Sequence, residues 1–146
     1  MTAIVVSGQS RGNMGRIAGK ITGIGSPGIT INPTNGVRVD LYFKNVGTVT
    51  AEFFGEVRMH NSLYSFGLTG AASPVTLEPN EEVGRRYDFT PSRFSIPSWP
   101  PGTYNIRALL FITPLPGTEV DREDLLNEVV IAEPSRHIQS VVVTSL

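Results

Sequence analysis

Two stretches near the middle of the chain alternate between apolar and polar side chains. Apolar residues occupy the odd positions from Val37 to Lys44, and apolar or small residues occupy them again from Val49 to His60, where Phe54 is the exception among the even positions. Such alternation is typical of strands with one buried face, because successive side chains of a strand point to opposite sides. Tyr104–Ile112 repeats the pattern. The residues expected in the core are Val39, Leu41, Phe53, Val57, Ile106 and Leu110.

The rest of the chain consists of short strand-like runs separated by turns. The 15 Gly and 11 Pro among 146 residues favour turns over long helices. Four prolines in Pro91–Gly102 exclude a central strand there. Asp121–Leu126 is expected to form one helical turn, with Asp121 as its N-cap. Further strands are expected at 16–24, 29–31, 63–68, 83–89, 126–132 and 138–144. The predicted fold class is therefore all-β.

The composition argues against several classes of function. A formal net charge of −1 offers no basic field for nucleic acid, and no apolar run is long enough to span a membrane. The absence of cysteine excludes disulfide scaffolds, thiol catalysis and cysteine-based zinc sites. Lys20 and Lys44 are the only lysines beside ten arginines, a bias that suggests a hot environment. The first residues lack the pattern of a secretion signal.

The segment Gly8-Gln9-Ser10-Arg11-Gly12 matches the G-x-S-x-G pattern of a nucleophilic serine. The pattern requires a following helix, which the glycines up to Gly23 argue against. His60 and His137 are the only candidate bases, and nothing in the sequence pairs either with Ser10. We therefore expect no catalytic residue and a flexible arm here, in which Ser10→Ala is neutral.

No metal or cofactor site is expected. The acidic stretch Glu119–Glu128 lacks the spacing of a calcium-binding loop, and its bland interpretation is a solvated segment. Two distant histidines make a poor zinc site. Trp99, which lies between prolines, is expected to pack on one end of the fold rather than to serve as a carbohydrate platform.

Three short motifs carry a resemblance to a known family. Asn45-Val46-Gly47, Leu77–Glu81 and Pro101–Ile106 are similar to the N-x-G, L-x-P-G-E and P-G-x-Y-x-[IV] landmarks of bacterial and archaeal Ig-like modules of the cell-adhesion-related kind. Asn80 stands where that family has glycine. The resemblance covers about Gly36 to Thr113 and implies an Ig-like antiparallel β-sandwich in which Tyr104 starts the sixth strand. It implies a fold and not a function.

About 100 residues suffice for such a sandwich, which leaves apolar segments at both ends. The expected organisation is an N-terminal arm (1–15), the sandwich (16–113) and a C-terminal extension (114–146). The arms contain strand-forming residues, so they are expected either to dock on the chain's own sheets or to pair with a neighbouring subunit. An apolar patch is expected on a strand face. The expected contact residues are Ile4, Val5, Val6, Phe54, Leu109 and Phe111.

This combination of a small β-sandwich with apolar terminal arms resembles the capsid decoration (cement) proteins of tailed bacteriophages. The resemblance implies a non-enzymatic virion protein that binds the major capsid protein or another virion surface as a homo-oligomer, most simply a trimer, without nucleic acid or membrane. The arginine bias would suit a thermophilic phage. An Ig-like adhesion or carbohydrate-binding module of a larger cell-surface protein is the alternative.

Overall fold

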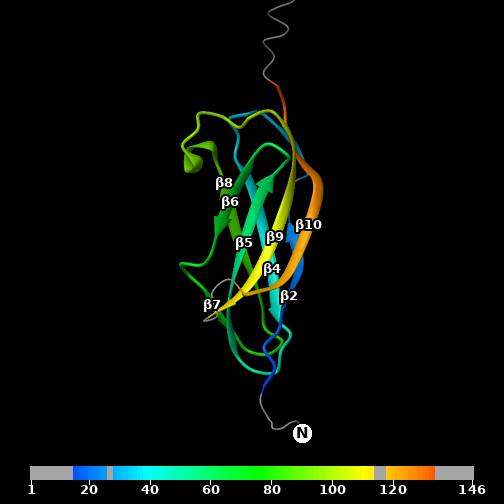
Figure 1. Ribbon diagram of the computed structural model, residues 1–146, viewed down its shortest axis with the longest axis vertical. Coiled ribbons are helices and arrows are strands. Elements are labelled where there is room, and N and C mark those ends of the chain that lie inside the picture. Colours follow the sequence, from blue (N-terminus) through cyan, green and yellow to red (C-terminus); the bar gives the residue numbers. More distant parts are fainter. Residues whose placement is uncertain (1–14, 26–27, 114–117, 134–146) are drawn as a thin grey trace, which may run out of the picture.

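Two sheets pack face to face in the computed structural model, which describes residues 15–25, 28–113 and 118–133 (Figure 1). The three-stranded sheet has the order β2-β4-β8, and the six-stranded sheet has the order β3-β10-β9-β5-β6, with β7 also paired to β5. A short 3₁₀ helix, η1 (Pro91–Phe94), follows β8. The strands are β2 (Gly19–Gly25), β3 (Thr30–Ile31), β4 (Val37–Asn45), β5 (Ala51–His60), β6 (Ser65–Thr69), β7 (Val75–Leu77), β8 (Glu82–Phe89), β9 (Gly102–Thr113) and β10 (Thr118–Ile131).

The alternation in the sequence becomes the inner faces of the two sheets. All strand pairs are antiparallel except β3 with β10. The six residues predicted for the core are all fully buried, which confirms the expected strands and the all-β sandwich. They are Val39, Leu41, Phe53, Val57, Ile106 and Leu110.

Asn45, at the end of β4, is the only buried polar residue among those described. Its side-chain amide donates to the carbonyls of Val49 (2.9 Å) and Leu77 (2.8 Å), and its Oδ1 accepts from the backbone N–H of Gly47 (2.8 Å). One side chain thus joins the β4–β5 turn to β7. The motif residue Asn45 suits this position because a side-chain amide provides two N–H donors for the carbonyls and an oxygen that accepts from the N–H.

Tyr104, the third residue of β9, forms a second landmark of Ig-like folds. Its ring is fully buried, and its hydroxyl donates to the carbonyl of Pro100, at 2.6 Å. This bond back to a residue just upstream is the tyrosine corner of Ig-type sandwiches. It fixes the path of the proline-rich segment into the strand, as the resemblance implied.

The turn before β8 contains the residue that replaces the family's glycine. Asn80 has a φ of 73°, in the left-handed region that non-glycine residues avoid. Its backbone N–H still donates to the carbonyl of Asn45, at 2.8 Å. The turn therefore requires left-handed backbone dihedral angles at this position, and asparagine adopts them at a cost in conformational free energy.

Asn80→Gly is expected to raise the free energy of unfolding by about 0.5 kcal/mol, since glycine removes the side-chain strain. Asn80→Ala is expected to lower it by about 1 kcal/mol, because alanine lacks asparagine's tolerance of this region. Urea denaturation of the three proteins measures both changes. A gain in stability for the alanine variant would contradict the explanation.

The C-terminal part of the sandwich differs from expectation. Asp121–Leu126 forms no helical turn, because these residues lie within β10 and pair with β9. The sandwich therefore continues through Ile131, beyond the boundary expected at Thr113. The expected strand at 138–144 lies outside the described residues, as does the expected arm (1–15) except for Gly15.

Candidate functional site: the outer face of β5, β9 and β10

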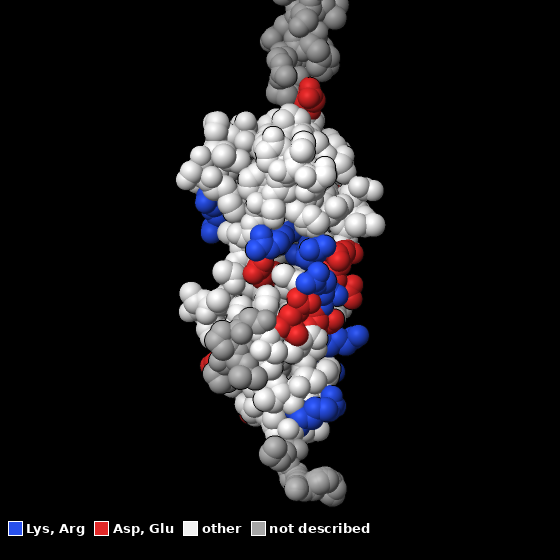
Figure 2. Space-filling model, in the orientation of Figure 1, with Lys and Arg blue, Asp and Glu red and all other residues white. Residues whose placement is uncertain are grey.

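Charged side chains gather in a band across one face of the molecule (Figure 2). They lie on the side of the six-stranded sheet that points away from the core, on the three neighbouring strands β5, β9 and β10. We call this surface the outer face. The strand register places Arg58 beside Arg107, Glu56 beside Leu109, and Phe54 beside Phe111.

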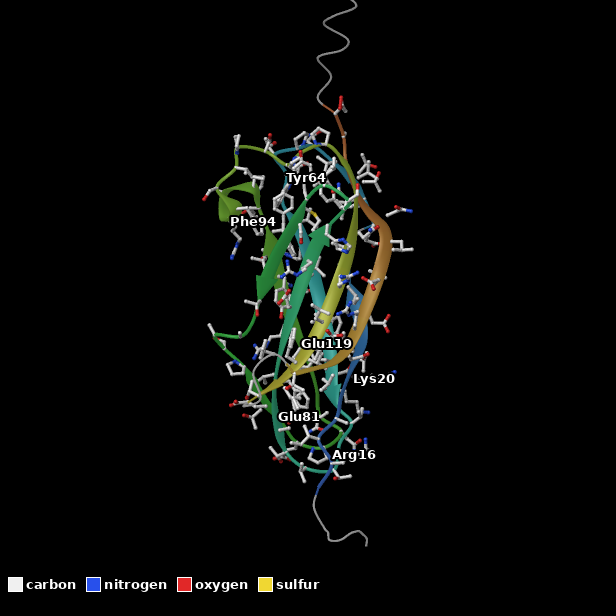
Figure 3. The ribbon with its side chains drawn as sticks, in the orientation of Figure 1. Arg16, Lys20, Tyr64, Glu81, Phe94 and Glu119 are labelled. Atoms are coloured by element: carbon white, nitrogen blue, oxygen red, sulfur yellow. The ribbon has the colours of Figure 1, made fainter. Side chains whose placement is uncertain are left out.

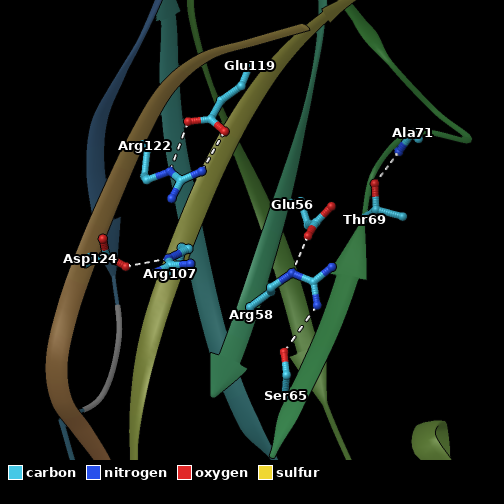
Figure 4. A network of polar contacts seen from close by, with 9 residues as sticks. All are labelled: Glu56, Arg58, Ser65, Thr69, Ala71, Arg107, Glu119, Arg122 and Asp124. Atoms are coloured by element: carbon cyan, nitrogen blue, oxygen red, sulfur yellow. Dashed lines mark hydrogen bonds and ion pairs between the residues drawn. The ribbon is translucent and has the colours of Figure 1, made fainter. Parts of the chain in front are cut away.

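Three ion pairs make up the band (Figure 4). Arg58 pairs with Glu56 (2.6 Å), Arg107 with Asp124 (2.8 Å) and Arg122 with Glu119 (2.8 Å). The hydrogen bond from Arg122 holds the pKa of the Glu119 carboxyl below its usual value, so this acid stays charged. The band therefore has three positive and three negative groups and no net charge.

The three sequence-predicted contact residues of this face lie together. The rings of Phe54 and Phe111 are stacked, with centroids 5.1 Å apart and planes 11° apart, and both rings are partly exposed. Leu109 points to the same face but is only 8% exposed. The solvent-accessible apolar surface at this site thus comes from the two phenylalanines.

His60 lies at the end of β5 on the same face. Its Nε2 is buried and has no hydrogen-bond partner among the described residues. Burial, followed by the charge of Arg107, lowers its pKa below the usual value, so the ring is neutral at pH 7. The lowered pKa makes this imidazole a weaker base than a solvent-exposed histidine.

The remaining candidates for chemistry are not brought together. The described part of the chain holds no cluster of three or more residues that could bind a metal ion. Trp99 is fully buried, so it packs in the core as expected and offers no exposed platform. Ile4, Val5, Val6, Ser10 and His137 lie outside the described residues. None of the helices described is long and apolar enough to cross a membrane.

The ion pairs could not be predicted from the sequence. Arg122 and Glu119 are only three residues apart, but Arg107 and Asp124 meet only because β9 and β10 pair in one particular register. That register includes irregularities between Glu119 and Asp121 and between Leu125 and Val129. The acidic stretch, taken alone, suggested a solvated segment. In the structure Asp124 pairs with Arg107 of β9, and Glu119 pairs with Arg122 of its own strand.

Comparison with known proteins shows a similarity of fold. No protein-family model matches the sequence, and a search of curated proteins also found no match. Among solved structures, a Niemann-Pick type C2 protein from the Japanese carpenter ant has a TM-score of 0.53 at 10% identity, covering 79% of this chain and 93% of that one. The CARDB domain of a Pyrococcus furiosus protein has a TM-score of 0.50 at 19% identity, covering 81% and 97%.

A β-glucosidase from Erythrobacter marinus also contains a similar region, with a TM-score of 0.50 at 14% identity. The match covers 78% of this chain but only 16% of the glucosidase, so the likeness is to one part of that enzyme. At such identities the structures share a fold and nothing more. With the sheet order and the tyrosine corner described above, the chain is an Ig-like β-sandwich.

Proposed function

We propose that this chain is a non-catalytic structural module that associates with copies of itself through the outer face. The stacked pair Phe54–Phe111 carries the proposal. Two partly exposed aromatic rings on the inner strands β5 and β9 of a sheet gain free energy when a partner covers them. Aromatic residues surrounded by polar groups are also the usual centre of a protein interface.

The charges around the pair favour another copy of the chain as the partner. A face of one sign would repel its own copy, whereas the outer face carries both signs: three arginines lie in ion pairs with acids, and Glu52 adds one further acid. Ion pairs can therefore exchange partners between subunits without leaving a charge unpaired. We take a trimer as the expected state, with Ile4, Val5 and Val6 as additional contacts to a neighbour.

The finer proposal is that the oligomer decorates a larger protein surface, namely a virion capsid. Its support comes from the sequence: apolar, β-branched runs at both ends and arginine in place of lysine. An adhesion-type module of a larger surface protein is the second candidate. The fold shared with the archaeal CARDB domain favours it.

Size-exclusion chromatography with light scattering tests self-association. The wild-type chain is expected to elute as an oligomer, and Phe54→Arg to weaken association at least tenfold, because the new charge would face Phe111 and Arg58 of the same surface. Leu126→Arg is the matched control, since Leu126 is 72% exposed on β10 and lies away from the pair. A wild-type monomer at high concentration would contradict the proposal.

Attachment is tested separately by cosedimentation with undecorated capsids of a thermophilic tailed phage. A decoration protein is expected to sediment with the capsids and to saturate at a fixed ratio. An adhesion-type module would stay in the supernatant, whatever its oligomeric state, and this result would favour the second candidate.

A further inference from the structure

A cavity of about 260 Å³ opens between the two sheets on the side where β6 and β8 are the edge strands. On the opposite side β2 and β10 approach each other, with a second hollow of about 230 Å³ between them. Phe43, Phe53 and Leu68 form the apolar lining. This volume is slightly below the range of drug-sized ligand sites, about 300–1,000 Å³, so it suits a small ligand.

Arg85 lies at the mouth of this cavity, in a position that is unusual for a charged residue. Arg85 pairs directly with Leu41, and paired residues of neighbouring strands share a face, so Arg85 leaves β8 on the core side. Arg93, from η1, lines the same cavity. Both are exposed, and neither belongs to an ion pair within the described ranges. Two exposed positive groups therefore lie at the cavity, whose lining also includes Arg86 and Asp88, the latter paired with Arg38.

The hydroxyl of Tyr87 lies deeper in the cavity. Tyr87 is only 7% exposed, and its Oη forms no hydrogen bond to any part of the chain that the structure describes. Two glycines make room for it: a Cβ at Gly55 would lie 2.8 Å from this oxygen, and one at Gly70 would lie 3.3 Å from it. Burial raises the pKa of Tyr87 to about 12, so the group remains a donor at neutral pH.

An inward-pointing charge on an edge strand also discourages pairing with other chains, and this accounts for Arg85 by itself. It does not account for the space beneath the arginine, for Arg93, or for the hydroxyl of Tyr87 that lines the same cavity. The Tyr87 oxygen is not among the described side-chain atoms that are fully enclosed without a partner, so it is accessible from the cavity. It can therefore donate a hydrogen bond to an acceptor that a ligand brings.

We propose that this cavity binds a small carboxylate with an apolar body, such as a medium-chain fatty acid. The carboxylate lies at the mouth, where guanidinium groups of Arg85 and Arg93 donate paired hydrogen bonds to its two oxygens. Tyr87 donates from the inner side. The hydrocarbon part lies against Phe43, Phe53 and Leu68, where burial removes it from water. The cavity lies between the sheets and the outer face on the other side of β5, and Phe54 belongs to both.

Isothermal titration calorimetry with octanoate tests the proposal, with octanol and acetate as partial ligands. Octanoate is expected to bind at one molecule per chain. Octanol, which lacks the charge, is expected to bind at least tenfold more weakly, and acetate, which lacks the apolar body, not measurably. No octanoate binding at millimolar concentration, or equal binding of octanol, would overturn the proposal.

Two variants locate the site. Arg85→Gln and Tyr87→Phe are each expected to weaken octanoate binding about tenfold, as the loss of one hydrogen bond to a charged group predicts. Lys20→Gln is the control, because it removes the same charge from β2, at the other edge of the three-stranded sheet. Arg85 is exposed, so its variant keeps the fold. Unchanged affinity in Arg85→Gln, or an equal loss in Lys20→Gln, would refute the site.

Discussion

Trp99→Ala is expected to lower the free energy of unfolding by about 3–5 kcal/mol, the range for deleting a large buried aromatic ring. Trp99 is fully buried, and its ring centroid lies 5.0 Å from that of Phe66 and 5.8 Å from that of Phe94. Its indole N–H also donates to the carbonyl of Asn35, at 2.7 Å. The substitution would therefore open a cavity and leave a carbonyl unpaired at one end of the sandwich.

Urea denaturation followed by circular dichroism measures this loss, since the variant has no tryptophan to report by fluorescence. Trp99→Phe separates the two causes: it keeps most of the ring volume and removes the N–H. We expect it to cost less than half as much as Trp99→Ala. If both variants were as stable as the wild type, the aromatic cluster at this end would not be part of the core.

Asn45→Ala is the second large effect, expected to cost about 3–5 kcal/mol. The substitution removes three hydrogen bonds and leaves the carbonyls of Val49 and Leu77 and the N–H of Gly47 without partners. Each buried group left unpaired costs about 1–3 kcal/mol. The loss is large because one side chain serves three backbone groups from two separate segments.

Asn32→Ala is the matched control for this experiment. Asn32 is exposed, and its side chain forms no hydrogen bond within the described residues, so its removal is expected to change stability by less than about 0.5 kcal/mol. Thermal unfolding of both variants by calorimetry makes the comparison. Similar melting temperatures for the two would show that the buried amide does not hold the turn.

The strands of the core could be predicted because the alternation of apolar and polar residues is visible within each strand. From Val37 to His60 the inward and outward side chains differ in polarity at nearly every position, and one strand suffices to show the pattern. The motif residues Asn45 and Tyr104 were also identifiable, since their hydrogen bonds reach only to backbone nearby in the fold. Local pattern and tertiary structure agree in this part of the chain.

Strand β10 shows where local evidence fails. Asp121–Leu126 has the acidic start of a helix, yet pairing with β9 overrides that preference, and its charged residues face solvent and the arginines of neighbouring strands. The cavity between the two sheets could not be predicted from the sequence either. Arg85 departs from the alternation of β8, but only the register that places it opposite Leu41 shows that it faces the interior.

The parallel pairing of β3 with β10 has a mechanical consequence. The backbone of Val130 bonds to Ile29 (3.0 Å) and that of Ala132 to Ile31 (2.9 Å), so segments near the two ends of the described chain lie side by side in one direction. The chain enters the sandwich near one pole, and β10 ends at the other (Figures 1 and 3). A tension applied through these ends would run along the strands, and it would load the β3–β10 bonds in shear, together rather than one after another.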